Sequence, residues 1–309
     1  MMSEAQPKHR LYAPRYWHVW LGFGLLRLVA LLPWSWMMAL GRGIGRLGMR
    51  ITPRRVRVTD INLRHCFPEL SERERADLVR RHFESMGMGI MDMAITWWAT
   101  DPEAHSLVRI HGRERAEAAL QGGSGVIFLS AHFTSIEMSA RALLWIGNVL
   151  PVYRPQRNPA VEWFVTRNRE SGNKQAVEKA IPRDDVRQML RALKAKKGIW
   201  FAPDQNFGDK YSLFSPFFGV PAATNTATSR LAKMTGARVL PFVAVRREDA
   251  PGYDLYIEPP LEEFADGDLQ RDTDRINAII ERWVRRAPAQ YLWSHRRFKD
   301  RPEGEERFY

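Results

Sequence analysis

Short apolar runs alternate with amphipathic segments along most of the chain. Runs rich in β-branched and aromatic residues, which are typical of buried strands, cover residues 108–111, 125–130, 149–154, 198–203, 237–247 and 253–258. Helical patterns cover residues 71–100, 137–146, 185–197, 224–236 and 269–287. The first of these opens with Ser71 and Glu74 at the spacing of a capping box. The alternation predicts an α/β fold in which a mixed central sheet carries helices on both faces.

The most apolar segment lies near the N-terminus, at residues 17–40, which read WHVWLGFGLLRLVALLPWSWMMAL. A bilayer-spanning helix needs about 20 apolar residues, and here Arg27 and Pro33 interrupt the run. Tryptophans bracket the segment, as they do at membrane–water interfaces: Trp17, Trp20, Trp34 and Trp36. We therefore expect an N-terminal membrane-anchoring helix that either spans the bilayer or lies in its interface.

Basic residues follow this segment without an intervening acidic one. Arg42, Arg46 and Arg50 repeat at a spacing of four and so share one face of a helix. That face is either solvated or in contact with anionic head groups of the cytoplasmic leaflet. Positive charge after the apolar segment predicts a cytoplasmic body, although basic residues also precede the segment. We expect residues 1–50 to form the anchor and a basic juxtamembrane helix, and residues 51–309 to form a cytoplasmic domain that carries the chemistry.

Composition narrows the class of partner. The 309 residues carry 47 basic and 35 acidic side chains, a formal net charge of +12 that favours anionic partners. Nucleic acid, an anionic membrane face, and an acidic protein or substrate all fit this charge. The sequence has no zinc-ligand pattern and no aromatic RNA-binding block, so we expect no nucleic acid partner. The single cysteine, Cys66, excludes an intrachain disulfide and is expected to be a buried small residue.

Residues 126–140, VIFLSAHFTSIEMSA, combine a strand pattern with two titratable side chains. His132 follows the predicted strand, and ligands of open α/β sheets collect at this end of the strands. Glu137 lies five positions later, so the two side chains meet only if His132 is in the loop and Glu137 in the first helical turn. The alternative is structural, because Thr134 and Glu137 have the spacing of a capping box. These residues alone leave both interpretations open.

Two further predicted strands end in polar residues. They are Arg154 and Arg157 after one strand, and Asp204, Gln205 and Asn206 after the other. The carboxyl ends of strands are where α/β proteins build their binding sites. Arg154 is the stronger candidate, since an arginine there can hold a phosphate or stabilise an oxyanion. Asn158-Pro159 and Gly208 are instead typical of turns.

Several blocks along the chain resemble the late acyltransferases of lipid A biosynthesis, the lauroyl and myristoyl transferases of Gram-negative bacteria. These blocks are NLRHCFPEL at 62–70, AHFTSIEMSAR at 131–141, VYRPQRNP at 152–159, SGNK at 171–174, WFAPDQNFG at 200–208, FFGVPAATNTATSRLAK at 217–233, VLPFV at 239–243 and APAQYLWSHRRFKDRPEG at 287–304. The wider glycerolipid acyltransferase group shares an H-x4-D/E motif, which this chain has as His132 and Glu137. PDQNFG stands where the glycerol-phosphate enzymes have E-G-T-R, which argues against a glycerol-phosphate acceptor.

The resemblance is strongest to the lauroyltransferase branch that acts on Kdo2-lipid IVA. It implies a fold like that of the glycerolipid acyltransferases and transfer of a fatty acyl group, usually lauroyl, from acyl carrier protein to a hydroxyl of that lipid. It also implies work at the cytoplasmic face of the inner membrane, beside anionic lipid, without a metal or cofactor. The alternatives are a myristoyl-type lipid A acyltransferase, an acyltransferase on another membrane glycolipid or phospholipid, and a basic membrane-surface protein without catalysis.

The resemblance also implies roles for individual residues. His132 would be the general base, and Glu137 would orient it and stabilise the imidazolium. Arg154, the backbone amides of residues 133–135 and Asn206 are candidates for stabilising the oxyanion. Further candidates for contact with anionic substrate groups are Arg157, Lys174, Asp204, Gln205 and Arg230. The tail residues Arg296, Arg297 and Lys299 are expected either to face the membrane or to be surface charge.

Overall fold

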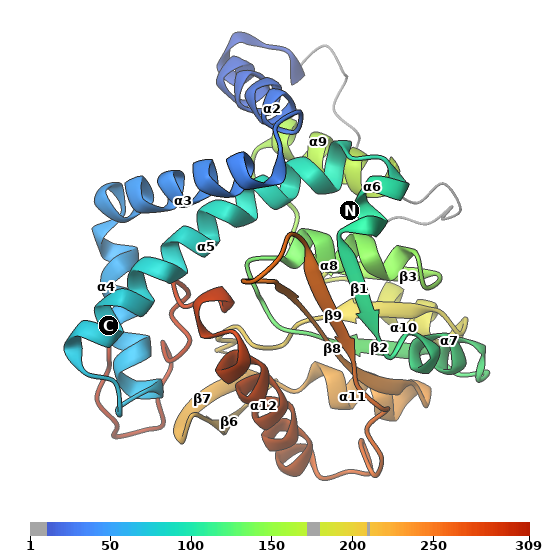
Figure 1. The fold of residues 1–309 in the computed structure, drawn as a ribbon. Coiled ribbons are helices and arrows are strands. Elements are labelled where there is room, and N and C mark those ends of the chain that lie inside the picture. The colour runs from blue at the N-terminus through green and yellow to red at the C-terminus, as the bar shows by residue number, and fades with distance from the viewer. Residues whose placement is uncertain (1–10, 172–179, 209–210) are drawn as a thin grey trace.

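The computed structural model describes residues 11–171, 180–208 and 211–309. The strands are β1 (Val108–His111), β2 (Val126–Leu129), β3 (Val149–Tyr153), β4 (Ile181–Pro182), β5 (Gly198–Phe201), β6 (Ser212–Phe217), β7 (Val220–Asn225), β8 (Arg238–Arg246) and β9 (Tyr253–Ile257). Within the described residues, a seven-stranded sheet has the order β1-β9-β8-β2-β5-β3-β4, and β6 pairs with β7 in a separate hairpin (Figure 1). All the strands predicted from the sequence are present, and β4, β6 and β7 are additional.

The central sheet is mixed, as predicted. Strands β8, β2, β5, β3 and β4 run parallel to one another, whereas β9 is antiparallel to β8 and β1 is parallel to β9. Parallel strands bring their carboxyl ends to one edge of the sheet. The loops that follow β2, β5 and β3 therefore lie at the same edge, and these loops carry most of the candidate site residues.

Helices cover both faces of the sheet, which confirms the predicted layers. In β2, Val126 and Phe128 belong to a core with α7 (Arg113–Gln121) and α8 (Ile136–Leu144). The alternate residues Ile127 and Leu129 belong to a larger core on the other face. That core includes residues of α10 (Val186–Lys194), α11 (Ala227–Thr235) and α12 (Leu269–Arg286). Burial on both faces explains why β2 is a continuous apolar run.

The β6–β7 hairpin was missed, and the helix predicted from residue 224 begins only at Ala227. Phe217 pairs with Val220, so the turn consists of Phe218 and Gly219 alone. Both have positive φ, 53° and 74°, as a two-residue hairpin turn requires. Asn or Asp is usual at the first position of such a turn, and Phe is unusual there. The sequence therefore lacks the Asn-Gly or Asp-Gly signal that predicts a hairpin.

The N-terminal third is helical. It comprises η1 (Pro14–Tyr16), α2 (Trp17–Val29), α3 (Trp34–Ile51), α4 (Pro53–Cys66), α5 (Glu72–Trp98) and α6 (Asp101–Ser106), while α9 (Pro159–Ser171) and η2 (Pro288–Gln290) lie later in the chain. The predicted capping box at the start of α5 is confirmed, because Ser71 Oγ accepts from Glu74 N and Glu74 Oε2 accepts from Ser71 N. Cys66 is buried, as expected.

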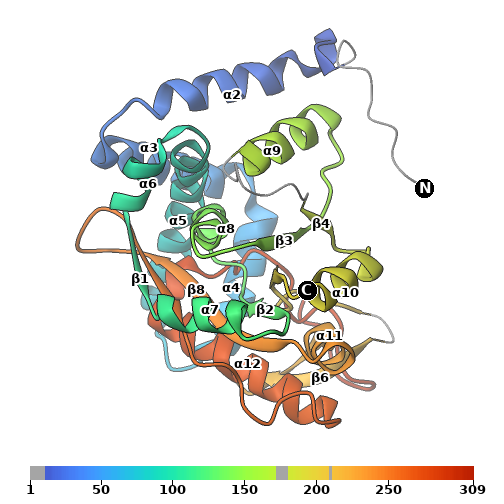
Figure 2. The same ribbon diagram turned by 90° about the vertical axis from the view of Figure 1, so that its right-hand side faces the viewer.

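The apolar segment at 17–40 is divided between two helices that separate at Ala30–Pro33. Within the described part of the chain, none of the helices combines the length and the apolar character needed to cross a membrane. Helix α2 lies at one end of the molecule beside α9, where Phe23 stacks on Phe164 (Figure 2). Large apolar side chains nevertheless remain exposed along α2 and α3: Trp17, Leu21, Leu25, Leu28, Trp36, Leu40, Leu47 and Ile51.

Candidate active site

His132 and Asp204 form a hydrogen-bonded pair at the carboxyl edge of the sheet. Leu129 is in register with Phe201 in the parallel pair of β2 and β5, and each titratable residue lies three positions beyond its strand's last paired residue. Because the two strands end in register and the two residues follow at the same distance, their side chains come together. His132 Nδ1 lies 2.6 Å from Asp204 Oδ1, and the His132 backbone N–H donates to Asp204 Oδ2 at 3.0 Å. The carboxylate thus fixes both the ring and the backbone of the histidine.

The electrostatics of this pair favour an ionised aspartate. Burial acts to raise the pKa of Asp204, but the positive charge and hydrogen bonds of His132 outweigh it and bring that pKa to about 2. Burial likewise acts to lower the pKa of His132, but the Asp204 charge and hydrogen bond raise it overall. His132 keeps 24% of its side chain exposed, and none of the described residues hydrogen-bonds its Nε2. The free nitrogen is therefore available to a substrate proton.

The predicted partner of His132 requires a correction, because Asp204 rather than Glu137 occupies Nδ1. Asp204 is buried and its carboxylate is bonded to the ring and the backbone of His132, while the expected contact of Asp204 with a substrate stays a prediction. Glu137 is the second residue of α8 and is buried. The alternative of a Thr134–Glu137 capping box is wrong, since Ser135 is the N-cap and forms no side-chain cap bond. A direct catalytic part for Glu137 stays a prediction.

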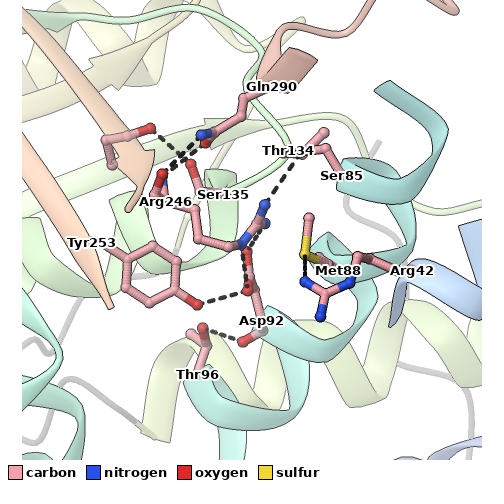
Figure 3. Close-up of polar contacts among 11 residues, drawn as sticks. Arg42, Ser85, Met88, Asp92, Thr96, Thr134, Ser135, Arg246, Tyr253 and Gln290 are labelled. Atoms are coloured by element: carbon pink, nitrogen blue, oxygen red, sulfur yellow. Dashed lines mark hydrogen bonds and ion pairs between the residues drawn. The ribbon is translucent and has the colours of Figure 1, made fainter. Parts of the chain in front are cut away.

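The segment that carries His132 is clamped by residues 290–292. Leu292 N donates to His132 O at 2.9 Å, and Thr134 N donates to Gln290 O at 2.8 Å. The Gln290 side chain in turn bonds both backbone polar groups of Arg246, at 2.8 Å each (Figure 3). Residues 290–300, called the C-terminal strap below, are thus hydrogen-bonded to the loop that carries His132 on one side and to the end of β8 on the other.

A second connection runs from the same loop to α5. The Thr134 hydroxyl lies 2.7 Å from Ser85 Oγ, which accepts from Arg246 at 3.2 Å (Figure 3). Arg246 also pairs with Asp92, which accepts a 2.6 Å bond from the Tyr253 hydroxyl. Ser85, Asp92 and Arg246 are buried and mutually bonded, so they anchor the loop before α8 to α5 and to the end of β8.

The loop that carries Asp204 is held by the C-terminal strap as well. Asn206 N donates to His295 Nε2 at 3.0 Å. The Asn206 side chain exchanges two hydrogen bonds with Asp300, at 2.7 and 3.1 Å. Residues 290–300 therefore contact both loops of the His132–Asp204 pair and set their relative position.

Comparison with known proteins shows the family of the chain. The model of a family described as bacterial lipid A biosynthesis acyltransferase matches residues 4–300. The chain belongs to this family. It is 39% identical to the lipid A biosynthesis lauroyltransferase of Escherichia coli K12 over 95% of each chain, and 37% identical to the palmitoleoyltransferase of the same strain over 100% of each. The myristoyltransferase of that strain is 29% identical over 94% of this chain and 90% of its own. The protein is a lipid A acyltransferase.

The geometry suits acyl transfer to a hydroxyl. A histidine with one nitrogen fixed by a carboxylate and the other exposed is the arrangement of a general base. The spacing of His132 and Asp204 from their strands is a sequence signal for their pairing. His132 and Asp204 follow the two apolar strands VIFL and GIWF at equal distance, so in-register parallel pairing of those strands would have placed them together.

The two arginines after β3 lie at the same edge of the sheet as His132. Pro151 and Phe128 both align with Trp200, so Arg154 is nearly level with His132 but two strands away, roughly 10 Å between strand axes. Arg154 and Arg157 are exposed. The turn predicted at Asn158-Pro159 is instead a helix start, because Pro159 is the first residue of α9 and Asn158 Oδ1 accepts from Ala160 N in its first turn.

The remaining candidates are scattered. Gln205, which stands between Asp204 and Asn206 in the chain, is half-buried. Arg230 on α11 donates a hydrogen bond to Thr226 Oγ1, and its guanidinium lies over the Tyr211 ring. Lys174 lies outside the described residues. Arg297 is not surface charge, because it is 1% exposed and donates to Ala223 O and Thr224 Oγ1. Arg296 and Lys299 are exposed.

Proposed function

We propose that this acyltransferase moves a lauroyl group from acyl carrier protein to a hydroxyl of Kdo2-lipid IVA. The observation that carries the proposal is the His132–Asp204 pair, with His132 Nε2 free at the carboxyl edge of the sheet. The lauroyl donor is proposed because the identity is 39% to the relative named a lauroyltransferase, against 37% for the palmitoleoyltransferase and 29% for the myristoyltransferase. No metal or cofactor is needed, because a thiolate is a good leaving group.

The steps follow from the positions of the side chains. The acceptor hydroxyl gives its proton to His132 Nε2 while its oxygen attacks the thioester carbonyl carbon. Asp204 stays ionised and stabilises the imidazolium that forms. The tetrahedral intermediate then expels the carrier's thiolate, which takes the proton from His132. General base catalysis of this kind contributes roughly 10²- to 10⁴-fold to the rate.

Exposed cations at the same edge would attract both substrates. Acyl carrier protein is acidic, and the acceptor carries phosphates and Kdo carboxylates. Arg154 and Arg157 stand beyond β3, where they would hold such anionic groups. Lys174 and Arg230 keep their proposed contact with substrate anions, and the excess of positive charge would speed both encounters most at low salt.

We further propose that the protein works at the cytoplasmic face of the inner membrane, with α2 and α3 in the lipid interface. In α2, the exposed Trp17, Leu21, Leu25 and Leu28 recur every three or four residues and so share one face. In α3, the exposed apolar residues lie next to a basic face formed by Arg42, Arg46 and Arg50. An apolar stripe flanked by arginines is typical of helices that lie in the interface of anionic membranes.

Mass spectrometry of an acyl transfer reaction tests the proposal. Membranes holding the protein receive lauroyl carrier protein and Kdo2-lipid IVA, and we expect a mass gain of one lauroyl group. The His132→Ala and Asp204→Ala variants should lose it, as should Glu137→Ala if that residue takes part in catalysis. His111→Ala is the matched control, because His111 and Asp254 form a similar pair, 2.9 Å apart, on the edge strands β1 and β9.

Other outcomes would redirect the proposal. A gain only with longer acyl donors would keep the acceptor and change the chain length. No gain with any acyl carrier donor would point to a different glycolipid or phospholipid acceptor. Full activity of a folded His132→Ala protein would contradict the mechanism.

A further inference from the structure

His295 lies between the two loops that carry His132 and Asp204. Leu292 N donates to His132 O, and one turn later His295 N donates to Leu292 O at 3.2 Å. The His295 side chain reaches the other loop, where Nε2 accepts from Asn206 N at 3.0 Å. His295 is thus connected by hydrogen bonds to the backbone of both loops, to one through Leu292 and to the other through Asn206.

The Asn206 contact fixes which nitrogen of His295 carries the proton. A backbone N–H can only donate, so Nε2 must present its lone pair. Burial lowers the pKa of His295 to about 4, so the ring is neutral near pH 7. A neutral ring whose Nε2 accepts carries its proton on Nδ1. None of the described residues hydrogen-bonds this Nδ1, and the atom keeps solvent-accessible surface.

We propose that His295 Nδ1–H donates a hydrogen bond to the thioester carbonyl oxygen as that oxygen becomes an oxyanion. The inference rests on the proposed acyl transfer, in which negative charge develops on this oxygen. A donor suits that role when it is held in place beforehand and does not itself transfer a proton, as a neutral imidazole held by Asn206 would be. His132 removes the acceptor's proton, and His295 stabilises the charge that results.

Two substitutions separate this role from a structural one. In His295→Gln, the side-chain amide reaches the place of Nε2, so its oxygen can still accept from Asn206 N, but the donor at Nδ1 is gone. In His295→Asn, the shorter amide puts an N–H near the place of Nδ1, and the acceptor for Asn206 is lost. We expect kcat of His295→Gln to fall about 10²-fold or more with its Tm near that of the parent. His295→Asn should keep more of kcat and lose Tm.

The measurement is kcat and KM with lauroyl carrier protein and Kdo2-lipid IVA, together with the Tm of each variant. The opposite order, in which His295→Gln is active and His295→Asn is not, would mean that His295 only anchors Asn206. Equal losses of kcat in both variants would also overturn the donor role. Failure of the proposed function is seen separately, because the parent protein would then transfer no acyl group or His132→Ala would stay active.

Discussion

Arg246 at the end of β8 and Asp92 on α5 form an ion pair whose side chains are only 4% and 0% exposed. The pair joins the sheet to the longest helix, and Tyr253 on β9 adds a third bond through its hydroxyl. Attraction between such charges is strong in a buried site, but it only offsets the cost of removing both from water. The pair therefore specifies how α5 docks on the sheet more than it adds to stability.

Removing one partner of this pair should be costly. In Asp92→Ala, the Arg246 guanidinium stays buried without a counter-charge, and we expect the free energy of unfolding to fall by about 3–5 kcal/mol. Urea unfolding followed by circular dichroism measures this. Asp77→Ala, which removes an exposed partner of Arg80 and Arg81, serves as the control and should change little. A loss of less than about 1 kcal/mol in Asp92→Ala would show that water reaches Arg246.

Close packing of α3 on α5 depends on glycines. A Cβ on Gly87 would lie 2.0 Å from Gly41 O and 2.6 Å from Gly45 N, both backbone atoms that cannot move aside. Gly87→Ala should therefore push the helices apart and lower the free energy of unfolding by about 1–3 kcal/mol. Gly43→Ala, where nothing lies within 4 Å, should instead stabilise α3 by up to about 1 kcal/mol. Equal effects of the two substitutions in thermal unfolding would contradict this account.

Most of the fold could be predicted from periodicity, because the strands are short apolar runs and their helices are amphipathic. Predictions failed where a local signal was absent or misleading. The Phe218-Gly219 turn lacks the usual hairpin residues. Thr134 and Glu137 have the spacing of a capping box, but the Thr134 hydroxyl is bonded to Ser85 instead. In both cases tertiary contacts override the local pattern.

The site could be predicted only in part for a related reason. His132 was found because it follows a strand within a distinctive block, but its partner depends on which strands are neighbours. The order β2-β5 places Asp204 beside His132 although 72 residues separate them. His295 contributes through the C-terminal strap, whose path across both loops has no periodic signal in the sequence.

The pH dependence of the reaction should report the Asp204–His132 pair. Asp204 raises the pKa of His132 above its ordinary value of 6.5, and a general base must be neutral, so the rate should rise with pH through that raised pKa. Asp204→Asn removes the charge, which should lower the maximal rate roughly 10²- to 10⁴-fold and move the rising limb to lower pH. Single-turnover rates between about pH 5 and about pH 9 measure both effects. If the rising limb of the pH–rate profile stays at the same pH in Asp204→Asn, the group that titrates is not His132.

Binding of the exposed apolar face of α2 to lipid is tested with vesicles. Leu21 and Leu25 are 66% and 55% exposed on one helix face. Full burial of a leucine is worth about 1.5–3 kcal/mol, so replacing both by glutamate should weaken sedimentation with anionic phospholipid vesicles at least about tenfold. Val186→Glu is the matched control, because Val186 is a similarly exposed apolar residue on α10, 52% exposed, and should leave binding unchanged. If the double variant sediments like the parent while raised salt releases both, the arginine face of α3 alone would account for the binding.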